Sequence, residues 1–274
     1  MHMNISLGQY YPGNSILHRA DPRVKILLSI AFMLLAFMAG SVYEFIVLIT
    51  FTVCSIAATG IPPQLILRSV KPILPLILFA SLINFFTAQG EPIFRLWIIA
   101  PTWEGAAIAA KLTARISLII LGGSSLMIFT TTPKMLTDGI ESLLNPLKRF
   151  RVPAHELAMM MTIALRFIPT LISEADIIMR AQASRGADFN EGKLLERARS
   201  FIPVIIPLFV SLFRRADELA NAMEARCYRG GEGRTKLRQL HITKIDVYFS
   251  SIFIALIAVF FIGRILGGPI PGIL

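Results

Sequence analysis

The chain has 274 residues, of which 55% are hydrophobic and only 16% are charged, and its formal net charge is +10. A soluble domain carries roughly 25% charged residues, so this composition, with a mean hydropathy of +0.67, argues against a soluble globular protein. Excess positive charge in such a hydrophobic chain is typical of cytoplasmic loops of membrane proteins. We therefore expect membrane lipid, and no nucleic acid, among the partners.

Apolar segments of nearly bilayer length recur along the chain. A helical span needs about 20 apolar residues. The five segments that approach this length are residues 24–40, 45–60, 73–87, 105–130 and 247–266. Pro62 and Pro63 end the second segment, because proline lacks an amide hydrogen and clashes with the preceding helical turn. The sequence predicts an all-α polytopic membrane protein with five transmembrane helices.

The segment between the fourth and fifth spans has a different composition. Residues 131–244 hold most of the 27 Lys and Arg residues and most of the 17 Asp and Glu residues. Apolar residues recur there at helical spacing, which predicts interfacial or partner-binding helices, divided or kinked by prolines into about three. We expect three regions: residues 1–130 with an N-terminal tail and four spans, residues 131–244 with the charged helices, and residues 245–274 with the last span and a tail.

The positions of the basic residues predict the orientation. They gather in the N-terminal tail, in the linker after the second span and in residues 131–244, and the positive-inside rule places such segments in the cytoplasm. The N-terminus is therefore expected in the cytoplasm and the C-terminus outside. The N-terminal residues lack a basic stretch followed by an apolar one, so we expect no cleavable signal peptide.

The sequence contains no pattern that suggests chemistry in this chain. The spans have no Asp or Glu away from their ends, although a secondary carrier needs an intramembrane charge or ion site. The phosphate-loop pattern G-x-x-x-x-G-K-[ST] is absent, and the four histidines are scattered. We expect no catalytic, cofactor or metal site, and a subunit that transmits force made elsewhere. A self-contained secondary carrier and an integral membrane enzyme are the alternatives.

One basic pair lies within the fourth span. Lys111 and Arg115 are four residues apart and so share a helix face. Two interpretations are open for this pair: the long side chains extend to the outer interface, or they pair with another subunit.

Two tripeptides in residues 131–244 place an arginine between small residues after a helical run. They are Ser184-Arg185-Gly186 and Ala225-Arg226-Cys227. Small neighbours leave space for the guanidinium to enter a partner's groove, where it can form bidentate contacts with carboxylates or bind backbone carbonyls. Alone, each arginine is typical of a solvated or capping residue, but the repetition favours a role in partner binding.

With these motifs the chain resembles the T component, the transmembrane coupling subunit, of energy-coupling factor transporters, the family of the cobalt transporter's Q-type protein. The resemblance covers nearly the whole chain. The segments that carry it are Gly8–Tyr10, Pro12–Ser15, His18–Lys25, Thr130–Pro133, Leu165–Pro169, Ala181–Gly186 and Ala222–Arg226. The family often has Ala-Arg-Gly twice, whereas here the tripeptides are Ser-Arg-Gly and Ala-Arg-Cys, with the arginine and small neighbours kept.

The resemblance implies a mechanism and a set of partners. Two cytoplasmic ABC-type ATPase subunits, which hold ATP and Mg²⁺, would each receive one arginine motif, and their closure would move the coupling helices of residues 131–244. The motion would drive vitamin or metal uptake through a possibly exchangeable membrane substrate-binding subunit, in the plasma membrane of a prokaryote. That subunit would dock on an adaptable apolar face, or the face would simply lie in the lipid interface. The residues of the face are Met159, Met160, Met161, Ile163 and Met179.

Overall fold

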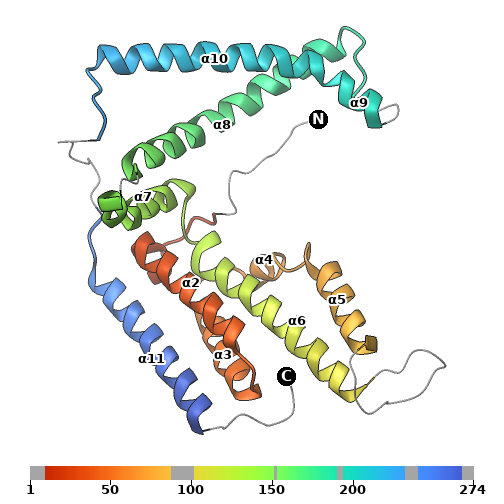
Figure 1. The fold of residues 1–274 in the computed structure, drawn as a ribbon, viewed down its shortest axis with the longest axis vertical. Coiled ribbons are helices and arrows are strands. Elements are labelled where there is room, and N and C mark those ends of the chain that lie inside the picture. The colour runs from red at the N-terminus through yellow and green to blue at the C-terminus, as the bar shows by residue number, and fades with distance from the viewer. Residues whose placement is uncertain (1–9, 88–101, 151–152, 190–193, 232–239, 267–274) are drawn as a thin grey trace. The chain divides into compact units, whose positions relative to one another are not determined.

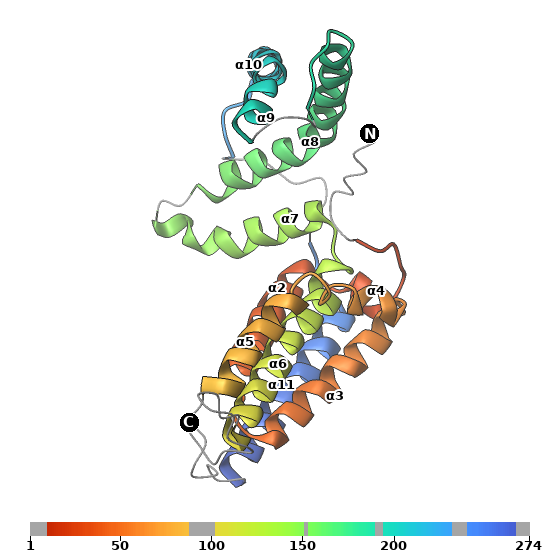
Figure 2. The ribbon, with the colours of Figure 1, turned by 90° about the vertical axis from the view of Figure 1, so that its right-hand side faces the viewer.

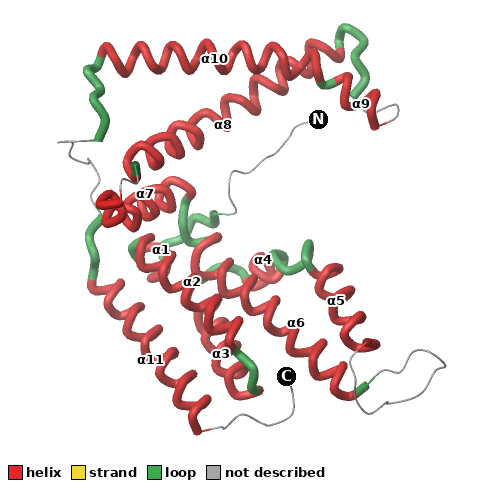
Figure 3. The backbone as a smooth tube through the Cα atoms, in the orientation of Figure 1, coloured by secondary structure: helices red, strands yellow, loops and turns green. Residues whose placement is uncertain are grey.

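A computed structural model describes residues 10–87, 102–150, 153–189, 194–231 and 240–266. Gly8 and Gln9 of the family-like N-terminal segment lie outside these residues. The described chain consists of helices joined by loops (Figure 3). It forms two compact units, residues 8–139 with 239–274 and residues 140–238 with 1–7, which we call the bundle unit and the arm unit. The three regions expected from the sequence stay a prediction.

The bundle unit contains the helices that arise from the five apolar segments. In chain order its elements are α1 (Ile16–Arg19), α2 (Pro22–Met38), α3 (Val42–Thr59), α4 (Pro63–Leu67), α5 (Leu74–Thr87), α6 (Trp103–Gly123), the π-helical turn η1 (Ser124–Ile128), the first half of α7 (Pro133–Leu144) and α11 (Lys244–Leu266). Helix α6 lies against α2, α3 and α5, and α11 lies against α2 and α3 (Figure 2). Each apolar segment therefore becomes a helix of one packed bundle.

Local capping explains where α2 and α3 begin. Asp21 accepts a hydrogen bond of 2.8 Å from the Arg23 amide. Proline at the first helical position of α2 suits the fixed backbone angle of that site. Ser41 and Glu44 form a reciprocal capping box at the start of α3, which pairs two amides at once. These caps satisfy amides that a helix start leaves without partners.

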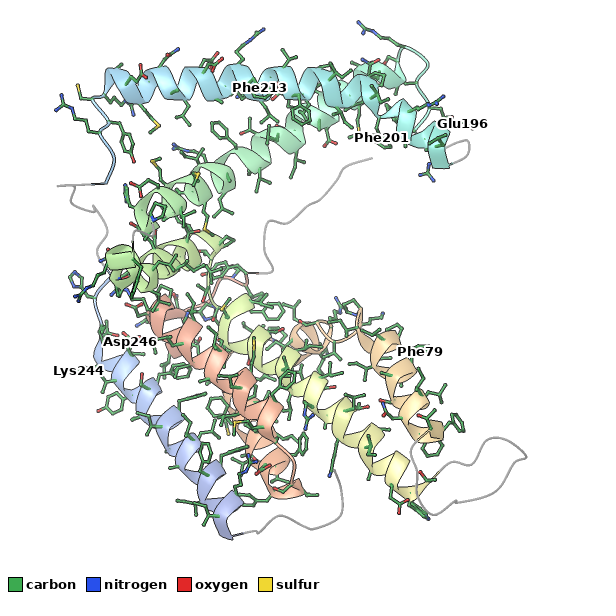
Figure 4. All side chains as sticks on the ribbon, in the orientation of Figure 1. Phe79, Glu196, Phe201, Phe213, Lys244 and Asp246 are labelled. Atoms are coloured by element: carbon green, nitrogen blue, oxygen red, sulfur yellow. The ribbon has the colours of Figure 1, made fainter. Side chains whose placement is uncertain are left out.

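The core of the bundle unit is aromatic and closely packed. Phe32 and Phe260 are fully buried, and Phe253 is nearly so. A Cβ on Gly122 would overlap the ring of Phe32, so α6 approaches α2 at a point where only glycine fits. Small residues at such positions are the usual way for membrane helices to pack. Phe79 on α5 instead points outward and is 63% exposed (Figure 4).

The number of membrane spans stays a prediction. Among the described residues, helix α3, helix α6 with η1, and α11 are long and apolar enough to cross a bilayer. Helix α2 has 17 residues, at the lower limit of the length of a span, and α5 has 14 residues, which is below it. A fourth helix of span length and composition is α8 (Ala154–Ala183), which lies in the segment expected outside the membrane.

The arm unit contains two long helices. After the 3₁₀ turn η2 (Asn145–Phe150) come α8, the short α9 (Leu194–Ser200) and α10 (Ile202–Ala225). Helix α10 packs against α8 and α9. Pro153 and Pro203 lie at helix starts, whereas Pro169 and Pro207 lie inside α8 and α10. The last two prolines therefore do not divide the segment.

Candidate functional site

Arg185 lies at the end of α8 inside a Schellman cap. The Ala187 amide donates to the Gln182 carbonyl at 3.0 Å, and the Gly186 amide donates to the Ala183 carbonyl at 3.0 Å. Gly186 has a φ of 89°, the left-handed conformation that this motif requires after the helix. The cap fixes the backbone of Arg185, while the side chain is exposed.

Arg226 lies in a second Schellman cap, at the end of α10. The Tyr228 amide donates to the Met223 carbonyl at 3.0 Å, and the Cys227 amide donates to the Glu224 carbonyl at 2.8 Å. Cys227 holds the left-handed position with a φ of 53°. Among the described residues it is the one non-glycine residue with positive φ. The Gly186 and Cys227 positions are therefore equivalent, and both arginines are presented by one backbone geometry.

The two predicted arginine motifs are exposed and far apart. The side-chain amide of Gln182, just before Arg185, donates to the Pro203 carbonyl in the first turn of α10 at 3.4 Å. Arg226 follows the last residue of α10, which is 24 residues long. At about 1.5 Å per residue the helix spans about 36 Å, and this length separates the two arginines. One compact partner groove cannot receive both.

Side chains join α8 to α10 between these ends. Glu174 accepts hydrogen bonds from the Ser211 hydroxyl and, at 3.2 Å, from the Arg215 guanidinium. The start of α8 and the end of α10 diverge from each other (Figure 1). This contact could not be predicted from the sequence, because opposite charges 41 residues apart carry no local signal.

The five predicted docking residues on α8 do not share one face. A helix turns by about 100° per residue, so Met161 and Met179 lie about 200° around the axis from Met159, with Ile163 close to Met159 and Met160 between them. Met160 and Met161 are 54% and 39% exposed, whereas Met159, Ile163 and Met179 are half-buried. The most accessible part of the predicted surface is Met160 with Met161.

Helix α10 carries a longer apolar stripe that the sequence analysis missed. Its exposed members repeat every three or four residues, which places them along one side of the helix. Phe213, at one end of the stripe, is 67% exposed (Figure 4). The stripe consists of Ile202, Ile205, Ile206, Phe209, Val210 and Phe213. The helical periodicity was the signal that could have identified it.

Arg115 binds within its own chain. Its guanidinium donates to the Ala39 carbonyl just after α2 at 2.6 Å, and the Arg264 guanidinium donates to the neighbouring Met38 carbonyl at 3.4 Å. Cations at a helix C-terminus satisfy its carbonyls and oppose its dipole. Arg115 thus fastens α6 to the end of α2, a role that neither sequence interpretation included.

Known proteins share this sequence over most of its length. The family model described as CbiQ, cobalt transport protein, matches residues 13–237. The energy-coupling factor transporter transmembrane protein EcfT of Ruminiclostridium cellulolyticum is 53% identical over 249 residues, which cover 91% of this chain and 93% of the relative. The EcfT of Acidaminococcus fermentans is 54% identical over 92% of this chain and 94% of its own. That of Bacillus subtilis is 42% identical over 94% and 97%.

These matches confirm the resemblance noted in the sequence, and they exclude the alternative of an integral membrane enzyme. The chain belongs to the CbiQ family and is a non-catalytic, multi-pass transmembrane component of a bacterial energy-coupling factor transporter.

Proposed function

We propose that this chain transmits ATP-driven motion from two cytoplasmic ATPase subunits, through Arg185 and Arg226, to a membrane-embedded substrate-binding subunit for vitamin or metal uptake. The duplicated cap carries the proposal, because two exposed arginines have one backbone geometry. They are separated by the length of α10, about 36 Å. Two copies of one partner can each recognise one arginine. ATP and Mg²⁺ belong to those partners.

The chemistry of the caps suits a groove lined by carboxylates or backbone carbonyls. Guanidinium forms bidentate contacts with such groups, and the flanking residues Ser184 and Ala225 are small and exposed. Because each arginine ends a long helix, displacement of the partner groove moves the whole helix. A flexible loop would absorb the same displacement.

The substrate-binding subunit is proposed to dock on the exposed apolar side chains of the arm unit. Met160 and Met161 on α8 and the stripe on α10 supply this surface. Unbranched methionine adapts to different partners, which suits a subunit that is exchangeable. The arm unit and the N-terminus then lie on the cytoplasmic side.

Co-purification tests the arginine sites. We expect Arg185→Glu or Arg226→Glu each to weaken association with the ATPase subunits, since a hydrogen bond to a charged group contributes about 1.5–3 kcal/mol, a factor of roughly 10 to 150. The double variant should abolish association and uptake. Arg180→Glu, an exposed position on the same helix as Arg185, is the matched control. Wild-type association in the double variant would refute the proposal.

Thiol labelling tests the orientation. Cys227 is exposed beside Arg226, so in a Cys54→Ser background a membrane-impermeant maleimide should label inside-out vesicles and leave right-side-out vesicles unlabelled. The reverse pattern would place the arm unit outside the cell and contradict the proposed docking of cytoplasmic ATPases.

A further inference from the structure

Residues 140–238 of the arm unit are joined to the bundle unit by two segments of the chain. The chain passes into the arm unit after Gly139 and belongs to the bundle unit again from residue 239. We call residues 130–139 the entry segment and residues 240–246 the exit segment. Both are part of the bundle unit, and any force that passes along the chain from residues 140–238 to the bundle unit passes through them.

The entry segment is bound by Lys25. The Lys25 ammonium donates to the Thr130 carbonyl at 3.1 Å and to the Thr131 hydroxyl at 3.2 Å. Lys25 is only 1% exposed, so these bonds form out of contact with water. Further along the segment, a Cβ on Gly139 would lie 3.2 Å from Cβ of Pro22. The start of α2 thus holds the entry segment at two points.

The exit segment is bound at the same helix start. Asp246, in the first turn of α11 (Figure 4), accepts a hydrogen bond of 2.5 Å from the Asp21 amide. Its other carboxylate oxygen accepts from the Thr243 amide at 2.7 Å and from the Thr243 hydroxyl at 2.8 Å. Asp246 is 1% exposed. One buried carboxylate therefore ties the exit segment to the cap of α2.

The charges of this cluster depend on one another. The carboxylates of Asp246 and Asp21 attract the Lys25 ammonium. A buried charge is costly unless it is paired and hydrogen-bonded, and removal of one partner leaves the others uncompensated. We therefore expect removal of one member to weaken the contacts at both segments.

From this geometry we propose that the turn Asp21–Lys25 is a clasp that fixes the entry and exit segments to the bundle, and that this fixation is required to convert motion of the arm unit into transport. The inference rests on the proposed coupling function. Lys25, Thr131 and Asp246 are positioning residues in it, and all three are buried.

The test uses the complete transporter, with both ATPase subunits and a substrate-binding subunit, in proteoliposomes. Uptake and ATP hydrolysis are measured on the same preparation. We expect Lys25→Met and Asp246→Asn to co-purify with the ATPase subunits as the wild type does and to hydrolyse ATP. Their uptake per ATP hydrolysed should fall by at least about fivefold, the lower end of usual coupling energies. Lys25→Arg, which keeps the charge and donors, should restore part of the ratio.

If the variants with charge substitutions do not fold, two milder variants test the same proposal. Thr131→Val removes one acceptor of Lys25 and keeps every charge, and Thr131→Ser keeps the hydroxyl. The valine variant should lower uptake per ATP, and the serine variant should match the wild type. Equal ratios in the two would overturn the clasp.

Glu44→Gln is the matched control for loss of a buried charge. Glu44 is 3% exposed and binds the Gly40 and Ser41 amides at 2.6 and 3.0 Å, at the opposite end of α2. It should lower stability but leave the ratio unchanged. The clasp is overturned if Glu44→Gln uncouples as strongly as Lys25→Met, or if Lys25→Met keeps the wild-type ratio. Uptake by the wild type without ATP hydrolysis would instead contradict the proposed function itself.

Discussion

The two arginine caps differ in the residue at the left-handed position, and exchange of that residue gives a quantitative test. Gly186 has a φ of 89°, and a Cβ there would meet no atom within 4 Å. Gly186→Ala therefore adds backbone strain and no clash. Cys227 already carries this strain at a φ of 53°, so Cys227→Gly removes it.

The magnitude follows from two opposing contributions. An L residue in the left-handed region costs roughly 1–2 kcal/mol, whereas glycine loses roughly 0.5–1 kcal/mol more conformational entropy on folding. The net difference is about 0.5–1 kcal/mol in favour of glycine. Since about 1.4 kcal/mol corresponds to a factor of ten, the cap should open about two to five times more often with the L residue.

Hydrogen exchange with mass spectrometry measures cap opening in the purified transporter. The reporters are the Ala187 amide at the first cap and the Tyr228 amide at the second, because each closes its motif. Gly186→Ala should accelerate exchange about two- to fivefold at the first cap, and Cys227→Gly should slow it by the same factor at the second. Unchanged exchange in both variants would refute the conclusion that the left-handed residue holds the arginine in place.

Three further substitutions test the packing. Gly122→Ala should lower the Tm in detergent, because the added methyl group meets buried Phe32 and overpacking costs about 1–3 kcal/mol. Glu174→Gln should broaden spin-label distances between α8 and α10, because it removes a partly exposed ion pair with Arg215; such a pair contributes up to about 1 kcal/mol. Arg115→Met should also lower the Tm, since a hydrogen bond to a charged group contributes about 1.5–3 kcal/mol. The lower end of that range applies, because the Arg115 side chain is half-buried.

Each of these substitutions has a neighbour as its control. Gly123→Ala meets only the flexible end of Met33, at 3.3 Å, and should leave the Tm nearly unchanged. Arg214→Gln removes an exposed charge beside Arg215. Lys111→Met removes the other cation of the pair in α6. A control that matches the effect of its partner would contradict the contact in question.

The sequence predicted the helices because long apolar segments give a strong signal. It placed both arginines after helical runs but predicted no cap, although Gly186 after a helix is typical of one. The second cap could not be recognised in this way, since cysteine rarely adopts positive φ. The sequence has no phosphate loop and no catalytic pattern, which favoured a non-catalytic subunit over an enzyme. Membership of the CbiQ family confirms this prediction. The arginine and methionine sites stay predictions.

Contacts between distant segments could not be predicted. Lys25 and Thr130 are 105 residues apart, and in the sequence Lys25 is indistinguishable from a basic residue flanking a span. Asp246 likewise has the appearance of a charge at a span end. The five docking residues predicted on α8 include side chains that do not share a face. Met159 and Met161 are close in sequence but lie about 200° apart around the helix.

The geometry of the arm unit bears on how the two proposed docking points, Arg185 and Arg226, would act on two helices. Arg185 lies about three helical turns beyond Glu174 along α8, and Arg226 lies about four turns beyond Ser211 along α10. Because α8 and α10 run in opposite directions at the Glu174 contact (Figure 1), the two arginines lie on opposite sides of it. If partners displace the two caps by similar distances, each helix turns about the Glu174 contact by a similar angle. If this contact is weakened, α8 and α10 slide past each other and the displacement is lost. Glu174→Gln should therefore lower uptake per ATP without weakening association with the ATPase subunits.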